Sequence, residues 1–157
     1  RVEVAMNRPA LSWTGSGYLD SNDGELPLEA SFAGWHWSRA HLQTGAAVTY
    51  DVTGRDGKGF SFGRHFDAAG RVRAFAPPPE AALPPSAWRI ARQARADAGA
   101  EARVLRTLED APFYARSVVQ TRWLDEPVTA MHESLSLARF DTGWVRWMLP
   151  FRMPRRP

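Results

Sequence analysis

The sequence contains no cysteine, a single lysine (Lys58) and no long apolar run. Without cysteine the protein has no disulfide bond, thiolate nucleophile or cysteine-based metal site, although its cellular compartment stays open. No apolar segment reaches the roughly 18 residues that a membrane-spanning helix requires. Because lysine is nearly absent, the net charge of +3 comes from arginines. These arginines are spread along the chain without a recognised nucleic-acid motif, so nucleic-acid binding is not expected.

Aromatic residues, in contrast, are abundant, with seven Trp, eight Phe and three Tyr in the sequence. This content predicts a large aromatic core or pocket. Three of the tryptophans, Trp13, Trp35 and Trp37, fall within residues 11–39. Trp35 and Trp37 are two positions apart in a strand-like run, so their side chains should share one face of a strand. Tryptophans in this pattern usually belong to a hydrophobic core, which is the alternative to a role in ligand binding.

The same stretch contains Tyr18, Asp20 and Asn22 at a spacing of two residues. In an extended segment this spacing places the three side chains on one face. Gly15 and Gly17 come just before them and allow a tight turn or a close approach of the backbone to another group. An aspartate followed by Ser-Asn-Asp-Gly is also typical of a plain turn, and this alternative stands beside a chemical role for Asp20.

Short alternating segments separated by polar turns predict an antiparallel β fold, either a barrel or a sandwich. The Gly-Arg-Asp-Gly sequence at residues 54–57 has strong hairpin chemistry. Between Phe113 and Trp123, residues expected on one face alternate with Arg116 and Arg122 on the other. Strands are expected at residues 1–6, 32–42, 46–52, 58–66, 71–76, 113–123 and 128–140, with one helical turn at 27–29.

Residues 77–85 mark the clearest boundary, because five of these nine positions are proline. Prolines fit neither the interior of a sheet nor a helix, so a semi-rigid linker between two structural units is expected. The following residues, 86–106, are rich in alanine and arginine. Their intrinsic propensity alone favours a helix that breaks near Gly99.

Several blocks of sequence resemble the carotenoid 1,2-hydratase family, also called hydroxyneurosporene synthase. The first comprises W-x-G-x-G-Y-L-D-S-N-x-G, then P-L-E, then F-x-x-W-x-W-S-R. The second comprises L-E-D-A-P-F-Y-A-R-S, then H-E-S-L-S-L-x-R-F, then W-V-R-W-M-L-P-F-R-M-P-R-R. Together the blocks span most of the chain, so chance does not explain the similarity.

The resemblance implies a pair of lipocalin-like β-barrels. Residues 1–76 would supply the later strands of the first barrel, and residues 86–157 would form the second. Residues 86–106 would then be strands rather than a helix, since tertiary context can override propensity. Members of the family are longer than this chain, which is therefore expected to correspond to their C-terminal half.

The activity implied by the resemblance is cofactor-free addition of water to the terminal C1–C2 double bond of an acyclic carotene such as neurosporene or lycopene. This reaction needs a proton donor to carbon, a stabilised tertiary carbocation and a water molecule. Asp20 is the expected acid, since burial among apolar groups would keep a carboxyl protonated. Tyr18 would support it as a second catalytic residue. The expected substrate-binding residues are Trp13, Asn22, Trp35 and Trp37.

Two other functions fit the same sequence features. A non-catalytic binder of apolar ligands would use the same pocket without acid chemistry, and a pericyclic, Diels–Alder-type cyclase would need neither a proton donor nor water. Glu133, expected on a face with Met131 and Leu135, is a candidate second buried acid unless the strand register shifts by one residue. The His132-Glu133 pair lacks a second histidine at helical spacing, so no metal site is expected there.

The last residues, 144–157, combine tryptophan and phenylalanine side chains with arginines. This combination suits a membrane–water interface, and a carotene is dissolved in lipid. The protein is therefore expected to be cytoplasmic and peripherally associated with a membrane. The alternative for this segment is a closing barrel strand followed by a frayed basic end. The sequence does not give the oligomeric state or the preferred carotene.

Overall fold

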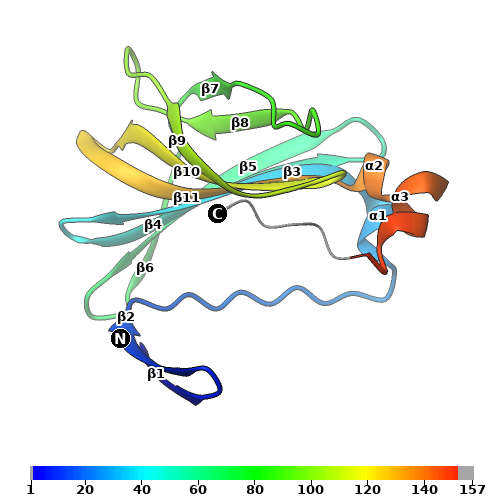
Figure 1. Ribbon diagram of the computed structural model, residues 1–157. Coiled ribbons are helices and arrows are strands. Elements are labelled where there is room, and N and C mark those ends of the chain that lie inside the picture. Colours follow the sequence, from blue (N-terminus) through cyan, green and yellow to red (C-terminus); the bar gives the residue numbers. More distant parts are fainter. Residues whose placement is uncertain (1, 152–157) are drawn as a thin grey trace.

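The computed structural model describes residues 2–151, and its main feature is an open antiparallel sheet of seven strands (Figure 1). The strand order is β6-β5-β4-β3-β11-β10-β9, and every neighbouring pair is antiparallel. The predicted antiparallel β fold is therefore confirmed, but within residues 2–151 the sheet does not close into a barrel. Its strands are β3 (Phe32–Leu42), β4 (Gly45–Gly54), β5 (Gly59–Asp67), β6 (Val72–Phe75), β9 (Arg103–Ala111), β10 (Tyr114–Trp123) and β11 (Glu126–Ser136).

Two tight turns explain how the strands from β4 to β6 follow one another directly. Gly57 and Gly70 both have φ of +78°, a left-handed conformation that glycine adopts without steric cost. Gly57 lies in the predicted hairpin turn, where its amide donates to the carbonyl of Gly54 at 3.1 Å. The strands predicted at 32–42, 46–52 and 58–66 are accordingly confirmed as β3, β4 and β5.

The sheet combines strands from both sides of the proline-rich segment 77–85. β3 precedes this segment and β11 follows it, yet the two strands pair from Gly34–Ser136 to Ala40–Ala130. The strand β7 (Glu80–Leu83) lies within this segment. It pairs with β8 (Arg92–Arg95), which follows the segment, to form a separate two-stranded sheet. The helix favoured by propensity in residues 86–106 does not form, while β8 and the start of β9 are strands. The division into two domains at 77–85 stays a prediction.

The β7–β8 hairpin lies over one face of the sheet (Figure 1). The side chains of β10 that face it alternate as predicted, and Ala115, Val119 and Trp123 are fully buried. Two arginines of β8 are also buried at this interface and have polar partners. Arg92 donates to the hydroxyls of Thr107 and Ser117 at 3.0 Å, and Arg95 pairs with Asp51 of β4.

The structure corrects the end of the strand predicted at 128–140. The strand β11 ends at Ser136, because the Ser136 hydroxyl accepts from the Arg139 amide and caps the short helix α2 (Leu137–Phe140). The side chains of β11 alternate between the two faces of the sheet, as predicted. His132 lies on the face covered by β7–β8 and is buried there. Glu133 lies on the opposite face with Met131 and Leu135 and is half-buried.

Three short helices gather at one end of the sheet: α1 (Leu28–Ser31), α2 and α3 (Gly143–Met148) (Figure 1). The alternative prediction of a closing barrel strand in the C-terminal segment is thus wrong for residues 143–148, which form α3. Residues 152–157 lie outside the described part of the chain. None of the helices within residues 2–151 is long and apolar enough to cross a membrane. At the N-terminal end, β1 (Val2–Asn7) confirms the strand predicted at 1–6 and pairs with β2 (Ala10–Gly15).

Candidate active site

The segment that carries the Tyr-x-Asp-x-Asn motif runs along the sheet face opposite the β7–β8 hairpin (Figure 1). Residues 16–24 have no regular secondary structure, so their position depends on individual contacts. The Tyr18 ring packs against Trp37 of β3 with 5.2 Å between centroids. Gly17 is needed for this path, because a Cβ atom there would collide with Val2 Cγ2. The guanidinium of Arg39 lies 5.5 Å from the centre of the Tyr18 ring.

The Asp20 carboxylate accepts hydrogen bonds from two phenols at the same oxygen, Oδ2. Tyr18 donates at 3.2 Å, and Tyr50 of β4 also donates to this oxygen. Among the hydrogen bonds of residues 2–151, Oδ1 has no partner. Tyr18 therefore contacts Asp20, while the catalytic roles of the two residues stay a prediction. The predicted burial of Asp20 is not observed, because its side chain is exposed in the described part of the chain.

Both phenols are held in the protonated, donating form. Burial raises the pKa of Tyr50, and the hydrogen bond to Asp20 raises it further. The pKa of Tyr18 is also raised, first by burial and then by the charge of Asp20. Because Tyr50 extends from the sheet, it ties the irregular segment containing Asp20 to a rigid strand. The pair of phenols therefore holds Oδ2, whereas Oδ1 has no hydrogen-bond partner among residues 2–151.

An aromatic row crosses the sheet next to Asp20. Trp37 lies beside Tyr50, and Tyr50 stacks on Phe62 of β5 with 5.1 Å between centroids. Trp37 is only 8% exposed, and its Nε1 is buried without an acceptor among the described residues. Trp35 lies on the same face of β3, as predicted, in the adjacent row with Val52. Tyr50 and Phe62 were not predicted as site residues, because only the cross-strand register places them beside Trp37 and Asp20.

Two predicted site residues do not join this cluster. Trp13 lies in β2 opposite Val4 and is half-exposed, without a contact to Asp20 in the described structure. Asn22 is exposed and makes no hydrogen bond among residues 2–151. Asn22 therefore belongs to the Tyr-x-Asp-x-Asn motif in sequence, but its side-chain amide has no hydrogen-bond partner among residues 2–151.

A second carboxylate lies in the same cross-strand row as Trp37. Glu133 of β11 is the direct partner of Trp37 in the β3–β11 ladder, so both side chains emerge on one face. Arg116 Nε donates to Glu133 Oε1 at 2.8 Å and to the Tyr114 hydroxyl at 2.9 Å. The side chain of Glu133 is 22% exposed. The face therefore combines a row of aromatic rings with an acid on each side of Trp37.

Comparisons with known proteins identify the family of the chain. The family model described as carotenoid hydratase CrtC matches residues 1–157. The chain is 55% identical to the acyclic carotenoid 1,2-hydratase of Thiocapsa roseopersicina, over 99% of this chain and 38% of that protein. It is 44% identical to the protein of that name from Rubrivivax gelatinosus, over 99% of the chain and 39% of that protein.

A third relative, the acyclic carotenoid 1,2-hydratase of Cereibacter sphaeroides, is 41% identical over all of this chain and 56% of its own length. The chain thus spans between about two fifths and somewhat over half the length of these relatives. No solved structure matches it. Since the family model covers every residue of the sequence, the chain belongs to the carotenoid hydratase CrtC family.

Proposed function

We propose that the protein is a hydro-lyase that adds water to the terminal C1–C2 double bond of an acyclic carotene such as neurosporene or lycopene, without a cofactor. The relatives' names and the family support this activity. The observation that carries the mechanism is the Asp20 carboxyl held against an aromatic face by the phenols of Tyr18 and Tyr50. A non-catalytic binder and a pericyclic cyclase have no comparable support.

In the proposed mechanism the protonated Asp20 donates its hydrogen from Oδ1 to C2 of the terminal double bond. The positive charge then develops at C1, where two methyl groups and the chain make the cation tertiary. The Tyr18 ring lies next to Asp20, packs on Trp37 and offers a π-face to this charge, a contact contributing about 0.5–2 kcal/mol. A polyene lying over the face would exclude water from Asp20. A water molecule adds to C1 and completes the alcohol.

We also propose that the open sheet forms part of a lipocalin-like barrel in the whole protein. The face that carries Trp37 and Tyr50 would then line its interior. This arrangement would give Asp20 the enclosure that residues 2–151 do not supply. It would also give a long apolar substrate room beside the acid.

Asp20→Asn is the direct test of the mechanism. The amide keeps the size of the side chain but donates no proton to carbon, so product formation should fall by at least 100-fold. Product is measured by chromatography after incubation of the protein with lycopene or neurosporene in membranes. Asp23→Asn is the matched control, since it makes the same chemical change at an exposed position of the same segment. Unchanged hydration by Asp20→Asn would rule out Asp20 as the acid.

The C-terminal helix supports the proposed peripheral association with a membrane from the cytoplasmic side. Trp147 is 72% exposed and packs against the exposed Phe151. Trp144 is also half-exposed, whereas Val145 anchors the helix in the interior. Large apolar side chains exposed beside Arg146 suit the boundary between lipid and water.

Liposome flotation tests this proposal with two single variants. Trp147→Gln should reduce flotation with anionic liposomes several-fold, because it removes the most exposed aromatic ring of the helix. Leu26→Gln is the matched control, since Leu26 is also exposed but lies outside the helix. Equal flotation of Trp147→Gln and the unaltered protein would remove the helix from the proposed membrane contact.

A further inference from the structure

Glu133 and Asp20 lie on either side of Trp37 on the same face of the sheet. In the cross-strand register, Glu133 of β11 is opposite Trp37 of β3, and Trp37 is opposite Tyr50 of β4. Tyr50 in turn donates to Asp20. Neighbouring strands are about 4.8 Å apart, so the backbones at Glu133 and Tyr50 are separated by about 10 Å. The two acids therefore flank the strand that carries Trp37.

Arg116 holds the Glu133 carboxylate in place. Its Nε donates to Oε1 at 2.8 Å, and the same guanidinium lies 5.7 Å from the centre of the Tyr114 ring. The Tyr114 hydroxyl accepts from Arg116 Nε, so the guanidinium is itself fixed. The charged partner of Glu133 is a guanidinium, whereas the described partners of Asp20 are phenols.

The indole of Trp37 provides a third polar group between the acids. Its Nε1–H is buried and has no acceptor among the described residues. Buried donors are normally satisfied by a protein group or an ordered water molecule. This indole N–H is directed toward the Tyr18 hydroxyl, whose pKa it lowers against the larger effect of burial.

We infer that Glu133 is the base that removes a proton from the water molecule as it adds to the carotene. This inference rests on the proposed function. Asp20 gives a proton to C2, the water oxygen forms a bond to C1, and one water proton passes to the Glu133 carboxylate. One alkene and one water are consumed and one alcohol is formed. The enzyme is left with Asp20 ionised and Glu133 protonated, and proton exchange with solvent restores both after product release.

The inference predicts that Glu133→Gln separates protonation of the carotene from its hydration. The amide keeps a hydrogen-bond acceptor for Arg116 but accepts no proton from water, so hydration should fall by at least 100-fold. Asp20 still protonates C2, and the cation returns to the alkene by losing a proton. In D2O the recovered carotene should therefore gain deuterium, as mass spectrometry measures, while little alcohol forms.

The matched control is Glu109→Gln. Glu109 of β9 also pairs with Arg116, at 3.9 Å, and lies farther along the same row, away from Trp37. Hydration and deuterium uptake should both remain within about threefold of the unaltered protein, since the ion pair with Arg116 is long and partly exposed. Asp20→Asn should lose both reactions, which tests the proposed acid separately from the base.

Two outcomes would overturn the role of Glu133. One is hydration by Glu133→Gln at the rate of the unaltered protein. The other is loss of both hydration and deuterium uptake in a folded Glu133→Gln protein, which would indicate that Glu133 only supports the structure around Asp20. If Glu133→Gln does not fold, as judged by circular dichroism, Glu133→Asp gives the same comparison, because it keeps the charge but withdraws the carboxylate by one methylene. A full rate of hydration in Glu133→Asp would likewise overturn the inference, whereas slow hydration with continued deuterium uptake would support it.

Discussion

At the scale of single residues, His132 is the most deeply buried titratable group, with none of its side chain exposed. Its Nδ1 hydrogen-bonds with the Ser38 hydroxyl at 2.8 Å, and its Nε2 hydrogen-bonds with the Ser134 hydroxyl at 3.0 Å. Burial, followed by the nearby charges of His36 and Arg92, lowers the pKa of His132 to about 3. The neutral ring is thus part of the packing between the sheet and the β7–β8 hairpin.

This environment makes stability depend on pH. In the unfolded chain His132 titrates near its ordinary pKa of 6.5, whereas in the folded protein it titrates near 3. Between these values the unfolded state binds a proton that the folded state does not bind. The free energy of unfolding should therefore decrease as the pH falls from 6.5 toward 3, by up to about 1.4 kcal/mol per pH unit. Urea unfolding at pH 7, 6, 5 and 4 measures this slope, and His132→Asn should show a shallower one. Parallel slopes for the two proteins would contradict the assignment.

The site also shows how far single residues can be predicted from the sequence. Tyr18 and Asp20 were identified because their contact is local, over a spacing of two residues. Tyr50 and Phe62 were missed because their place beside Trp37 comes from the pairing of β3, β4 and β5. Sequence alternation gives the residues that share a face of one strand, but it does not give the register between strands.

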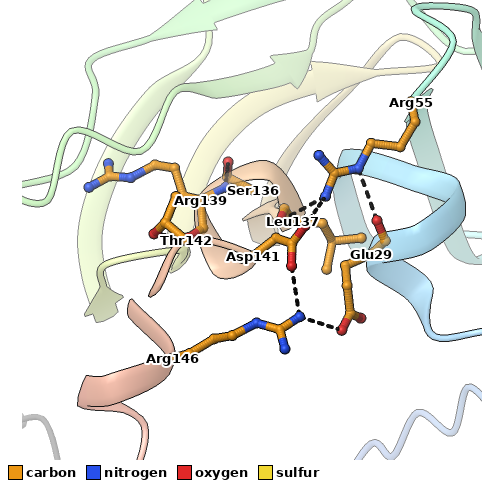
Figure 2. Close-up of polar contacts among 8 residues, drawn as sticks. All are labelled: Glu29, Arg55, Ser136, Leu137, Arg139, Asp141, Thr142 and Arg146. Atoms are coloured by element: carbon orange, nitrogen blue, oxygen red, sulfur yellow. Dashed lines mark hydrogen bonds and ion pairs between the residues drawn. The ribbon is translucent and has the colours of Figure 1, made fainter. Parts of the chain in front are cut away.

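At the scale of elements, the three helices depend on side chains from elsewhere in the chain. The helices α1 and α2 have four residues each, too few to be stable alone. Arg55, from the turn after β4, donates to the Glu29 carbonyl at 2.9 Å and to Asp141 at 3.4 Å (Figure 2). Arg146 of α3 donates to Asp141 at 2.7 Å and to the Glu29 carboxylate at 3.2 Å (Figure 2). The two arginines and two acids thus connect all three helices.

Asp141→Asn tests this connection, because Asp141 accepts from both arginines (Figure 2). The side chain of Asp141 is 46% exposed, so the expected loss of unfolding free energy is about 1 kcal/mol at low salt. In 1 M NaCl the loss should shrink, since salt screens exposed ion pairs. Asp56→Asn is the control, because the Asp56–Lys58 pair is more exposed and should contribute almost nothing. Thermal unfolding followed by circular dichroism compares them, and equal stability of both variants at low salt would contradict the role of Asp141.

The same helices mark where prediction of elements from the sequence fails. The strands from β3 to β5 were predicted nearly to the residue, because long alternation and glycine turns agree there. Between Leu135 and Phe140 the apolar residues fit both a strand and a single helical turn. The choice is made by the Ser136 hydroxyl, which caps α2, and by the Arg55 guanidinium, whose partner carbonyl on Leu137 is 82 positions away. Such distant contacts leave no local pattern.

At the scale of the whole molecule, the β3–β11 ladder joins the chain before residue 77 to the chain after it. A second connection is the ion pair between Asp51 of β4 and Arg95 of β8, with side chains 14% and 11% exposed. The Gln43 amide also donates to the Glu126 carboxylate at 2.9 Å. If the chain were two independent domains divided at 77–85, none of these contacts would be needed for either part to fold.

The structure instead predicts that residues 1–76 and 77–157 fold together. Expressed as separate chains, each part alone should lack a cooperative unfolding transition, because each leaves the edge of β3 or β11 unpaired. Co-expressed, they should co-purify as a 1:1 complex with the β-sheet spectrum of the intact chain. Asp51→Asn in the first part should weaken the complex by roughly 1–3 kcal/mol, because the buried Arg95 loses its partner on β4 and keeps only the more distant Glu80 carboxylate. Asp56→Asn, on the surface of the same part, should leave the affinity unchanged. Cooperative unfolding of either part alone, without association, would instead establish the division into two domains.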